Sequence, residues 1–256
     1  MDFEPGLTTT IAERFDKYII ADDVQVIDAA PHYGLLSVQG PQAWAAIEGT
    51  GLNFAKPEKV FHSRSLQHET LGEIYCMNQP RTGTAGFDVF APVNSLEPLA
   101  ELLLTAATAL GGRAAGWHAL ETARIEAGIP RFGAEMDETN LPPEAGLDAR
   151  AISYSKGCYI GQEIIARIRT YGQVAKALRG LRFAEGAGEL PQRGDKLFFG
   201  DKEVGSVSNA LRSPALGANL GLGYVRRERN EIGTELKVRT AGGETGAVIV
   251  ELPFVK

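Results

Sequence analysis

Cysteine is scarce in this sequence: the 256 residues contain two, Cys76 and Cys158, far apart in the chain. Neither belongs to a CxxC or Cys/His pattern, so the sequence predicts neither a zinc site nor an iron–sulfur cluster held by cysteines, and we assign no metal ligands. The residues alone do not decide whether the two cysteines form a disulfide, but two reduced thiols are the simpler interpretation.

Long apolar segments are also missing, because no run approaches the ~20 residues that a membrane-spanning helix needs. Met1 leads into Asp2, Phe3 and Glu4, which lack the basic residues that open a signal peptide. The net charge of −6 disfavours non-specific binding to nucleic acid. We therefore expect a cytoplasmic protein with no membrane partner, in which any contact with RNA or another anion depends on a local basic patch.

The composition is that of a folded globular protein, with 44% hydrophobic and 23% charged residues. The length suffices for one large domain or two modest ones. Helical periodicity and stop signals predict helices, the first of which opens with a capping box at Thr10. The predicted helices cover residues 10–18, 41–48, 94–110, 117–127 and 161–171, and the strands accompanying them cover residues 24–26, 34–38, 73–77 and 86–90.

The pattern changes from about residue 178 onward. Short apolar segments recur there between Gly, Pro, Asn and Asp residues, at a spacing typical of a small antiparallel barrel or sandwich. We therefore predict two domains, residues 1–176 and 177–256. The predicted strands of the second domain cover residues 197–199, 204–207, 220–225, 235–238 and 247–252.

Residues 156–163, Lys-Gly-Cys-Tyr-Ile-Gly-Gln-Glu, carry the chemistry that the sequence suggests most strongly. Two glycines allow the backbone to turn tightly, and the segment then enters a helix whose first N–H groups are unpaired donors. Lys156 and Cys158 share this turn, which favours an anion or a polarised heterocycle as the ligand. The alternative interpretation is a surface loop that contains a small buried cysteine.

This segment resembles the signature of the YgfZ-type folate-binding proteins, Lys-Gly-Cys-Tyr-x-Gly-Gln-Glu, at every specified position. Residues 122–130 are similar to the Arg-x-Glu-x-Gly segment that this family shares with the aminomethyltransferases of glycine cleavage. Residues 81–88 are similar to the family's Thr-Gly-x-x-Gly-Phe-acid turn, and residues 143–147 match its Pro-x-Glu-x-Gly-Leu loop. The similarity covers most of the chain.

The resemblance implies an α+β fold: an aminomethyltransferase-like, folate-binding body with a ferredoxin-like layer, followed by a C-terminal antiparallel β-barrel. It implies that tetrahydrofolate, or a derivative, is the cofactor. Asp88 stands where the family's acidic residue holds the pterin, and a carboxylate can accept two bonds from the pterin's amino group and ring N–H. The other residues that the resemblance assigns to the folate site are Arg124, Glu126, Lys156, Tyr159 and Gln162.

The resemblance also makes Cys158 the candidate catalytic or redox-sensitive residue. Two alternatives stay open from the residues alone: Asp88 could face solvent at a strand edge, and Arg124 could form an intrahelical pair with Glu121. A basic run could hold a polyglutamate tail or an RNA backbone, or be a solvated face. Its members are Arg167, Arg169, Lys176, Arg179 and Arg182.

The match begins in the middle of the family pattern, so we expect the chain to lack the family's N-terminal portion and the catalytic aspartate carried there. Arg81 occupies the position of the transferases' pocket tyrosine. Both departures weaken the interpretation as a transferase. The Lys-Gly-Cys-Tyr signature, which plain aminomethyltransferases lack, favours an accessory protein that binds folate and supports assembly or repair of iron–sulfur enzymes, including tRNA-modifying ones, with iron–sulfur proteins as partners. The alternative is a folate-dependent aminomethyltransferase or other one-carbon transferase, and a third hypothesis is a module that serves protein contacts alone.

Overall fold

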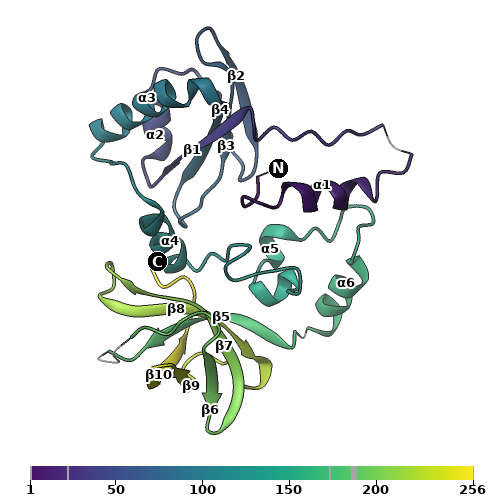
Figure 1. Cartoon of the computed structure of the whole chain (residues 1–256), viewed down its shortest axis with the longest axis vertical. Helices are drawn as coiled ribbons and strands as arrows, with labels where there is room; N and C mark the ends of the chain where they lie inside the picture. The colour runs from purple at the N-terminus through teal and green to yellow at the C-terminus, as the bar shows by residue number, and fades with distance from the viewer. Residues whose placement is uncertain (1, 22, 173, 186–188, 256) are drawn as a thin grey trace. The chain divides into compact units, whose positions relative to one another are not determined.

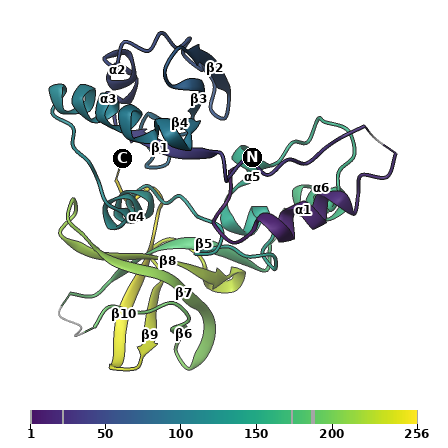
Figure 2. The same ribbon diagram turned by 45° about the horizontal axis from the view of Figure 1, so that its top comes forward.

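The computed structural model describes residues 2–21, 23–172, 174–185 and 189–255 (Figures 1 and 2). Its packing divides the chain into two compact units, Met1–Leu120 and Glu121–Lys256. Each unit has a sheet and a hydrophobic core of its own.

The first unit is built on a four-stranded antiparallel sheet in the order β1-β4-β3-β2. Strand β4 is central and pairs with β1 on one side and β3 on the other, so its side chains are the most enclosed of the sheet. The strands are β1 (Tyr33–Gln39), β2 (Ser63–His68), β3 (Gly72–Asn78) and β4 (Gly86–Pro92).

Two helices, α2 (Ala43–Glu48) and α3 (Leu96–Ala109), cover one face of this sheet (Figure 1). Because side chains alternate along a strand, Phe87 and Val89 of β4 point towards these helices and join Leu99 of α3 in the core. Phe87 also packs against Trp44 of α2, with 5.1 Å between the ring centroids. The same alternation places Asp88 on the opposite face.

Two predictions for the first unit are wrong. The first helix, α1 (Thr8–Asp16), begins before Thr10, and its N-cap residue Leu7 makes no side-chain capping bond. Residues 24–26 form no strand: Val24 and Val26 are exposed, and no neighbouring strand offers them hydrogen bonds.

Strand β2 was not predicted. The 3-10 turn η1 (Val93–Ser95) precedes α3, which ends before Gly111 as predicted.

The second unit ends in a closed antiparallel barrel with strand order β10-β5-β8-β7-β6-β9. The barrel confirms the predicted α+β class with a C-terminal antiparallel barrel. Its strands are β5 (Lys176–Phe183), β6 (Lys196–Phe199), β7 (Lys202–Ser213), β8 (Ala218–Arg226), β9 (Glu235–Thr240) and β10 (Gly243–Val250), with the 3-10 turn η3 (Arg227–Arg229) after β8. Strand β5 was not among the predicted strands.

Apolar side chains from all six strands fill the barrel, among them Leu181 and Phe183 of β5. Glycines allow the backbones to approach closely: a Cβ on Gly205 would lie 2.0 Å from the carbonyl oxygen of Tyr224, and one on Gly221 would lie 2.2 Å from that of Asn209. Any other residue at these two positions would push the strands apart.

Four short helical elements precede the barrel: α4 (Trp117–Glu126), η2 (Pro142–Ala145), α5 (Asp148–Ala151) and α6 (Gln162–Tyr171). The connection between α4 and α6 thus contains η2 and α5. The first barrel strand begins at Lys176, whereas the packing boundary lies inside α4, at Leu120 and Glu121. The predicted domain limits at residues 176 and 177 stay a prediction. No helix in the described part of the chain is long and apolar enough to cross a membrane.

Candidate functional site

Asp88 is a fully buried carboxylate in the middle of β4. It lies directly opposite Ser37 in the register of β1, and the Ser37 hydroxyl donates a hydrogen bond of 2.7 Å to Oδ1 of Asp88. The alternative of a solvent-facing Asp88 at a strand edge is therefore wrong. Burial of a carboxylate is costly unless it is hydrogen-bonded, so the other partners of Asp88 decide what this position can do.

Arg81 provides those partners. Its Nε donates to both oxygens of Asp88, at 3.2 Å to Oδ1 and 2.9 Å to Oδ2. Its Nη2 donates to Oδ2 of Asp88 and to Asp2, both at 2.6 Å. Two parallel N–H groups thus meet one carboxylate, which is the geometry of a strong charge-assisted pair. The Arg81 side chain is 27% exposed, so this pair closes the solvent side of Asp88.

The turn before β4 holds Arg81 in place. The side chain of Gln39 accepts a hydrogen bond from the backbone N–H of Arg81 at 2.9 Å and donates one to the carbonyl of Gln79 at 3.0 Å. A Cβ on Gly86 would lie 2.0 Å from Oε1 of Gln39. A side chain at the position of Gly86 would displace the amide of Gln39 and disturb its bonds to Arg81 and Gln79, which gives the glycine before Phe87 a physical reason.

The ionisation of the pair reflects both its burial and its charges. Burial raises the pKa of Asp88 above its ordinary value, and the hydrogen bonds and charge of Arg81 offset this only in part. Burial acts to lower the pKa of Arg81, but the hydrogen bonds and charges of Asp88 and Asp2 outweigh it, so that this pKa is raised. The buried carboxylate of Asp88 therefore needs hydrogen-bond donors beside it to be stable in its charged form.

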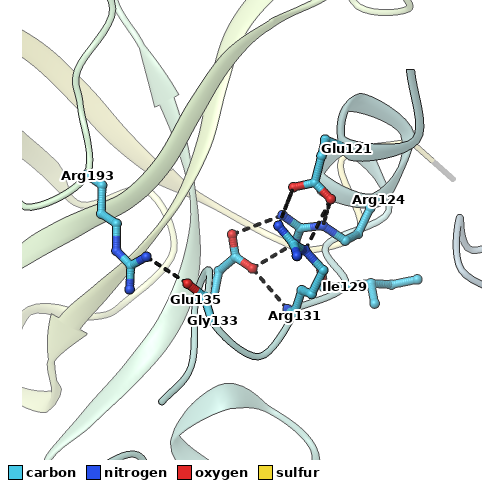
Figure 3. A network of polar contacts seen from close by, with 7 residues as sticks. All are labelled: Glu121, Arg124, Ile129, Arg131, Gly133, Glu135 and Arg193. Atoms are coloured by element: carbon cyan, nitrogen blue, oxygen red, sulfur yellow. Dashed lines mark hydrogen bonds and ion pairs between the residues drawn. The ribbon is translucent and has the colours of Figure 1, made fainter. Parts of the chain in front are cut away.

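Arg124, on α4, is the centre of a second buried network (Figure 3). Its guanidinium contacts Glu121 through Nε and Nη2, Glu135 through Nη1 and Nη2, and the carbonyl of Ile129 through Nη1. These five bonds match the five N–H groups of an arginine. The intrahelical pair with Glu121 exists, but it is one part of a larger network that keeps every donor of Arg124 occupied.

This network also shapes the chain that follows α4. Glu135 accepts a bond from the backbone N–H of Arg131 at 2.9 Å, and Arg193 donates to the carbonyl of Gly133 at 2.8 Å (Figure 3). Burial acts to raise the pKa of Glu121, but the hydrogen bonds and charges of Arg124 and Arg131 outweigh it and lower this pKa. The arrangement fits a structural role for Arg124, and its contact with a folate stays a prediction.

Glu126 connects α4 to the rest of the second unit. Its carboxylate accepts a hydrogen bond from the hydroxyl of Ser213 in β7, and its carbonyl accepts one from the backbone N–H of Phe254 at 2.9 Å. The side chain therefore fixes the helix against the barrel. Its predicted place behind Arg124 in a folate pocket stays untested.

The signature residues form a locally organised turn at the start of α6. Gly161 has φ 85° as the N-cap, and the side chain of Gln162 accepts a bond from the backbone N–H of Tyr159 at 3.3 Å. The ammonium of exposed Lys156 lies 4.9 Å from the centroid of the Tyr159 ring, a cation–π contact. The structure thus brings Lys156, Tyr159 and Gln162 together.

The two cysteines occupy opposite environments. Cys158 is exposed on this turn, which rules out its interpretation as a small buried residue, and Cys76 is buried in the first unit. Burial raises the pKa of Cys76 to about 12, and the charge of Asp88 adds to the rise. Cys76 and Cys158 form no disulfide with each other, which confirms the expectation of free cysteines.

The residues of the predicted basic run separate between α6 and β5. Arg169 stacks on Tyr154, with 4.2 Å from Cζ to the ring centroid, and Lys176 lies 4.8 Å from the ring centroid of Tyr224. Two members of the run thus have aromatic partners of their own, and whether the run binds an anion or is a solvated face stays a prediction. Among the residues that the structure describes, no group of three or more His, Cys, Asp or Glu side chains could hold a metal ion.

Ser37, Glu135 and Arg131 are among the residues of these networks that were not singled out from the sequence. Ser37 could have been found from strand alternation, had the pairing of β1 with β4 been known. The predicted folate residues divide between the units, with Asp88 in the first and the others in the second.

Comparison with known families divides the chain between residues 156 and 176, and so at another place than its packing, which divides it at Leu120 and Glu121. The model of the GCVT N-terminal domain matches residues 6–156, more than half of the chain, and the model of the glycine cleavage T-protein C-terminal barrel domain matches residues 176–256. The chain belongs to the glycine cleavage T-protein family. The narrower assignment to the YgfZ-type proteins stays a prediction.

Curated members of the T-protein family align over nearly the whole chain. It is 30% identical to the aminomethyltransferase of Symbiobacterium thermophilum, over 91% of this chain and 62% of that relative. It is 31% identical to the aminomethyltransferase of Cutibacterium acnes, over 97% of this chain and 67% of that relative. The chain thus spans about two thirds of the length of these relatives.

A solved structure has the same fold. The glycine cleavage system aminomethyltransferase T from Bartonella henselae matches with a TM-score of 0.79 and 23% sequence identity, over 98% of this chain and 66% of that one. At this level of identity the likeness concerns the fold.

Proposed function

We propose that this T-protein family member binds a tetrahydrofolate through Asp88 and takes part in the transfer of a one-carbon unit, of the aminomethyltransferase type. The curated relatives that support this are named aminomethyltransferases. The observation that carries the proposal is the buried carboxylate of Asp88 and its pair of N–H donors.

The chemistry of Asp88 fits a pterin. The 2-amino group and ring N–H of a pterin present two parallel donors, as the guanidinium of Arg81 does, and a carboxylate accepts both. A pterin would therefore replace the Arg81 donors one for one and leave no buried oxygen without a partner. Ser37 would keep its bond to Oδ1 and hold the carboxylate in its present orientation.

When bound, tetrahydrofolate supplies the nitrogen atoms that accept the one-carbon unit. The residues of this chain would hold and orient it: Asp88 and Ser37 at the pterin, with Gln39 keeping the Arg81 turn in register. Lys156, Tyr159 and Gln162 form a turn of the right chemistry, a cation beside an aromatic ring, to contact an anionic or heterocyclic group.

Equilibrium binding of tetrahydrofolate and 5-formyltetrahydrofolate to the purified chain tests the proposal. Asp88→Asn keeps the size of the side chain and removes one acceptor, so we expect affinity to fall about tenfold or more, equal to roughly 1.4 kcal/mol. Glu97→Gln, an exposed change on α3, is the matched control and should bind as the native chain does.

Circular dichroism and thermal unfolding would establish that each variant is folded. No saturable binding by a folded native chain, or equal binding by Asp88→Asn, would reject the proposal. Release of ammonia from an aminomethylated thiol, measured with and without tetrahydrofolate, would then test the transfer itself.

A second function is favoured by the exposed position of Cys158 beside Lys156 and Tyr159. An accessory role in the maintenance of iron–sulfur enzymes needs a surface that another protein can reach, and this turn offers an exposed thiol and an exposed cation. In cells that lack the gene, the native chain should restore the activity of an iron–sulfur enzyme and Cys158→Ser should not. Ser155→Ala, in the same turn, is the control, and equal rescue by Cys158→Ser would remove the cysteine from this role.

A further inference from the structure

A groove of about 640 Å³ lies within the second unit, between the end of α4, the η2–α5 segment, the start of β5 and the end of β10. Most of the residues that line it are apolar, and Ile232 projects from them with 64% of its surface exposed. This volume lies within the range of sites for small molecules, which are mostly apolar with a few polar groups. No residue of the Asp88 sheet lines the groove.

One wall carries a cation, Arg179 of β5, that stands on the interior side of the barrel. Because side chains alternate along a strand, Arg179 lies on the same face of β5 as Leu181 and Phe183, which are in the barrel core. Arg179 is nearer the start of β5 and therefore lies at the mouth of the barrel. An arginine in such a position is normally paired, because a half-buried charge without a partner loses hydration.

Within the described residues Arg179 has no carboxylate partner. Its Nε donates to the carbonyl of Asn230 at 2.9 Å and its Nη1 donates to the carbonyl of Leu178 at 3.2 Å. Burial lowers the pKa of Arg179, and no neighbouring acid raises it. By contrast Arg124, in the same unit, has all five N–H groups occupied.

The two bonds of Arg179 leave three N–H groups without an acceptor, two on Nη2 and one on Nη1. One N–H on each of these nitrogens can meet a carboxylate in the bidentate arrangement that guanidinium and carboxylate prefer. The other charged residues that line the groove are Arg150, Glu231 and Glu251, and all three are exposed.

We propose that this groove binds a small molecule with an apolar body and a single carboxylate, and that Arg179 binds the carboxylate. The apolar walls accept the body of the molecule, and the carboxylate supplies the charge that Arg179 lacks. The charged residues that line the groove besides Arg179 are one cation and two anions, Arg150, Glu231 and Glu251, and their net negative charge disfavours a ligand with several negative charges. This site is separate from the proposed pterin contact at Asp88 and does not depend on it.

The experiment compares two probes of nearly equal size, 4-phenylbutyrate and its neutral amide, by calorimetric titration of the native chain. We expect saturable binding of 4-phenylbutyrate and at least tenfold weaker binding of the amide. Arg179→Gln should weaken binding of the carboxylate at least tenfold. Arg182→Gln, on the same strand but exposed, is the matched control and should bind as the native chain does.

A second variant keeps the proposal testable if Arg179→Gln does not fold. Ile232→Glu changes an exposed side chain of the groove and adds a negative charge, so it should fold normally and also weaken binding of 4-phenylbutyrate. Equal binding of the two probes, equal binding by folded Arg179→Gln or by Ile232→Glu, or no saturation below about 10 mM would overturn the proposal. Tetrahydrofolate binding, measured on the same variants, should stay unchanged and so separates this result from the test of Asp88.

Discussion

Arg81 and Asp88 form an ion pair across one turn and the start of β4, with 2.6 Å between Nη2 of Arg81 and Oδ2 of Asp88. The carboxylate is fully buried and the guanidinium is partly exposed. Because the guanidinium presents the same pair of donors as a pterin edge, it occupies the contact that a bound folate would need. Folate binding at Asp88 therefore requires Arg81 to leave.

This competition gives a prediction for Arg81→Gln. Removal of the guanidinium should raise the affinity for tetrahydrofolate about tenfold, because the ligand then meets an unoccupied carboxylate. The same change should lower the free energy of unfolding by about 2 kcal/mol, less than for a fully buried pair because Arg81 is partly exposed. Binding titrations and urea unfolding measure the two effects. A folded Arg81→Gln variant with weaker folate binding would show that Arg81 assists the ligand.

The two thiols should differ sharply in reactivity. We expect a thiol reagent such as 5,5′-dithiobis(2-nitrobenzoate) to modify Cys158 in the native protein at pH 8, since Cys158 is exposed. Cys76 should stay unmodified, because it is buried and burial raises its pKa to about 12. Cys158→Ser should abolish the native reaction, and both cysteines should react in the native-sequence chain once it is unfolded. Rapid modification of Cys76 in the folded Cys158→Ser variant would contradict the burial.

The sequence predicted those strands whose apolar residues alternate or run continuously, including β4 and most of the barrel. It missed β2, because at this polar edge of the sheet Leu66 alone joins the core. It missed β5, in which Arg179 and Arg182 interrupt the apolar pattern although the strand pairs with β8 and β10. It wrongly predicted a strand at residues 24–26 because Val24 and Val26 have a high β-propensity. A high β-propensity alone does not form a strand where no partner strand is available.

The residues of the candidate site could be predicted only where they belong to a local sequence motif. Residues 81–88 pointed to Asp88, and residues 156–163 pointed to the turn of Lys156 and Tyr159. The partners of Asp88 and Arg124 come from distant parts of the chain or from an irregular loop, as Ser37 and Glu135 show. Hydrogen bonds of that kind depend on the register of strands and on loop conformation, which no local pattern specifies.

The stability of the second unit should fall in acid through Glu121. The ion pairs of Glu121 with Arg124 and Arg131 lower its pKa below the usual 4.5, so its charged form is favoured more in the folded than in the unfolded chain. This contribution is present above pH 4.5 and is lost as the pH falls through the lowered pKa of the folded state. Glu121→Gln should therefore be less stable at pH 7 and lose less further stability below pH 4.5. Urea unfolding at a series of pH values checks this, and an unchanged slope of stability against pH would contradict it.

Glu135 should matter more for stability than any exposed acid near it. Its carboxylate is buried and accepts two bonds from Arg124, whose side chain is only 5% exposed, and one from the backbone of Arg131. Glu135→Ala would leave the buried guanidinium of Arg124 with Glu121 as its remaining counter-charge and two of its N–H groups without acceptors. Breaking such a pair typically lowers the free energy of unfolding by about 3–5 kcal/mol.

Two further variants make this prediction specific to the charge network. Glu138→Ala, an exposed change in the same loop, should alter the free energy of unfolding by less than about 0.5 kcal/mol. Replacement of both partners, Arg124→Met with Glu135→Leu, should recover part of the loss, because a buried pair costs less to replace with apolar residues than to break. Denaturant unfolding of the single and double variants gives the coupling energy of the pair. A Glu135→Ala variant as stable as Glu138→Ala would mean that Glu121 alone compensates the charge of Arg124.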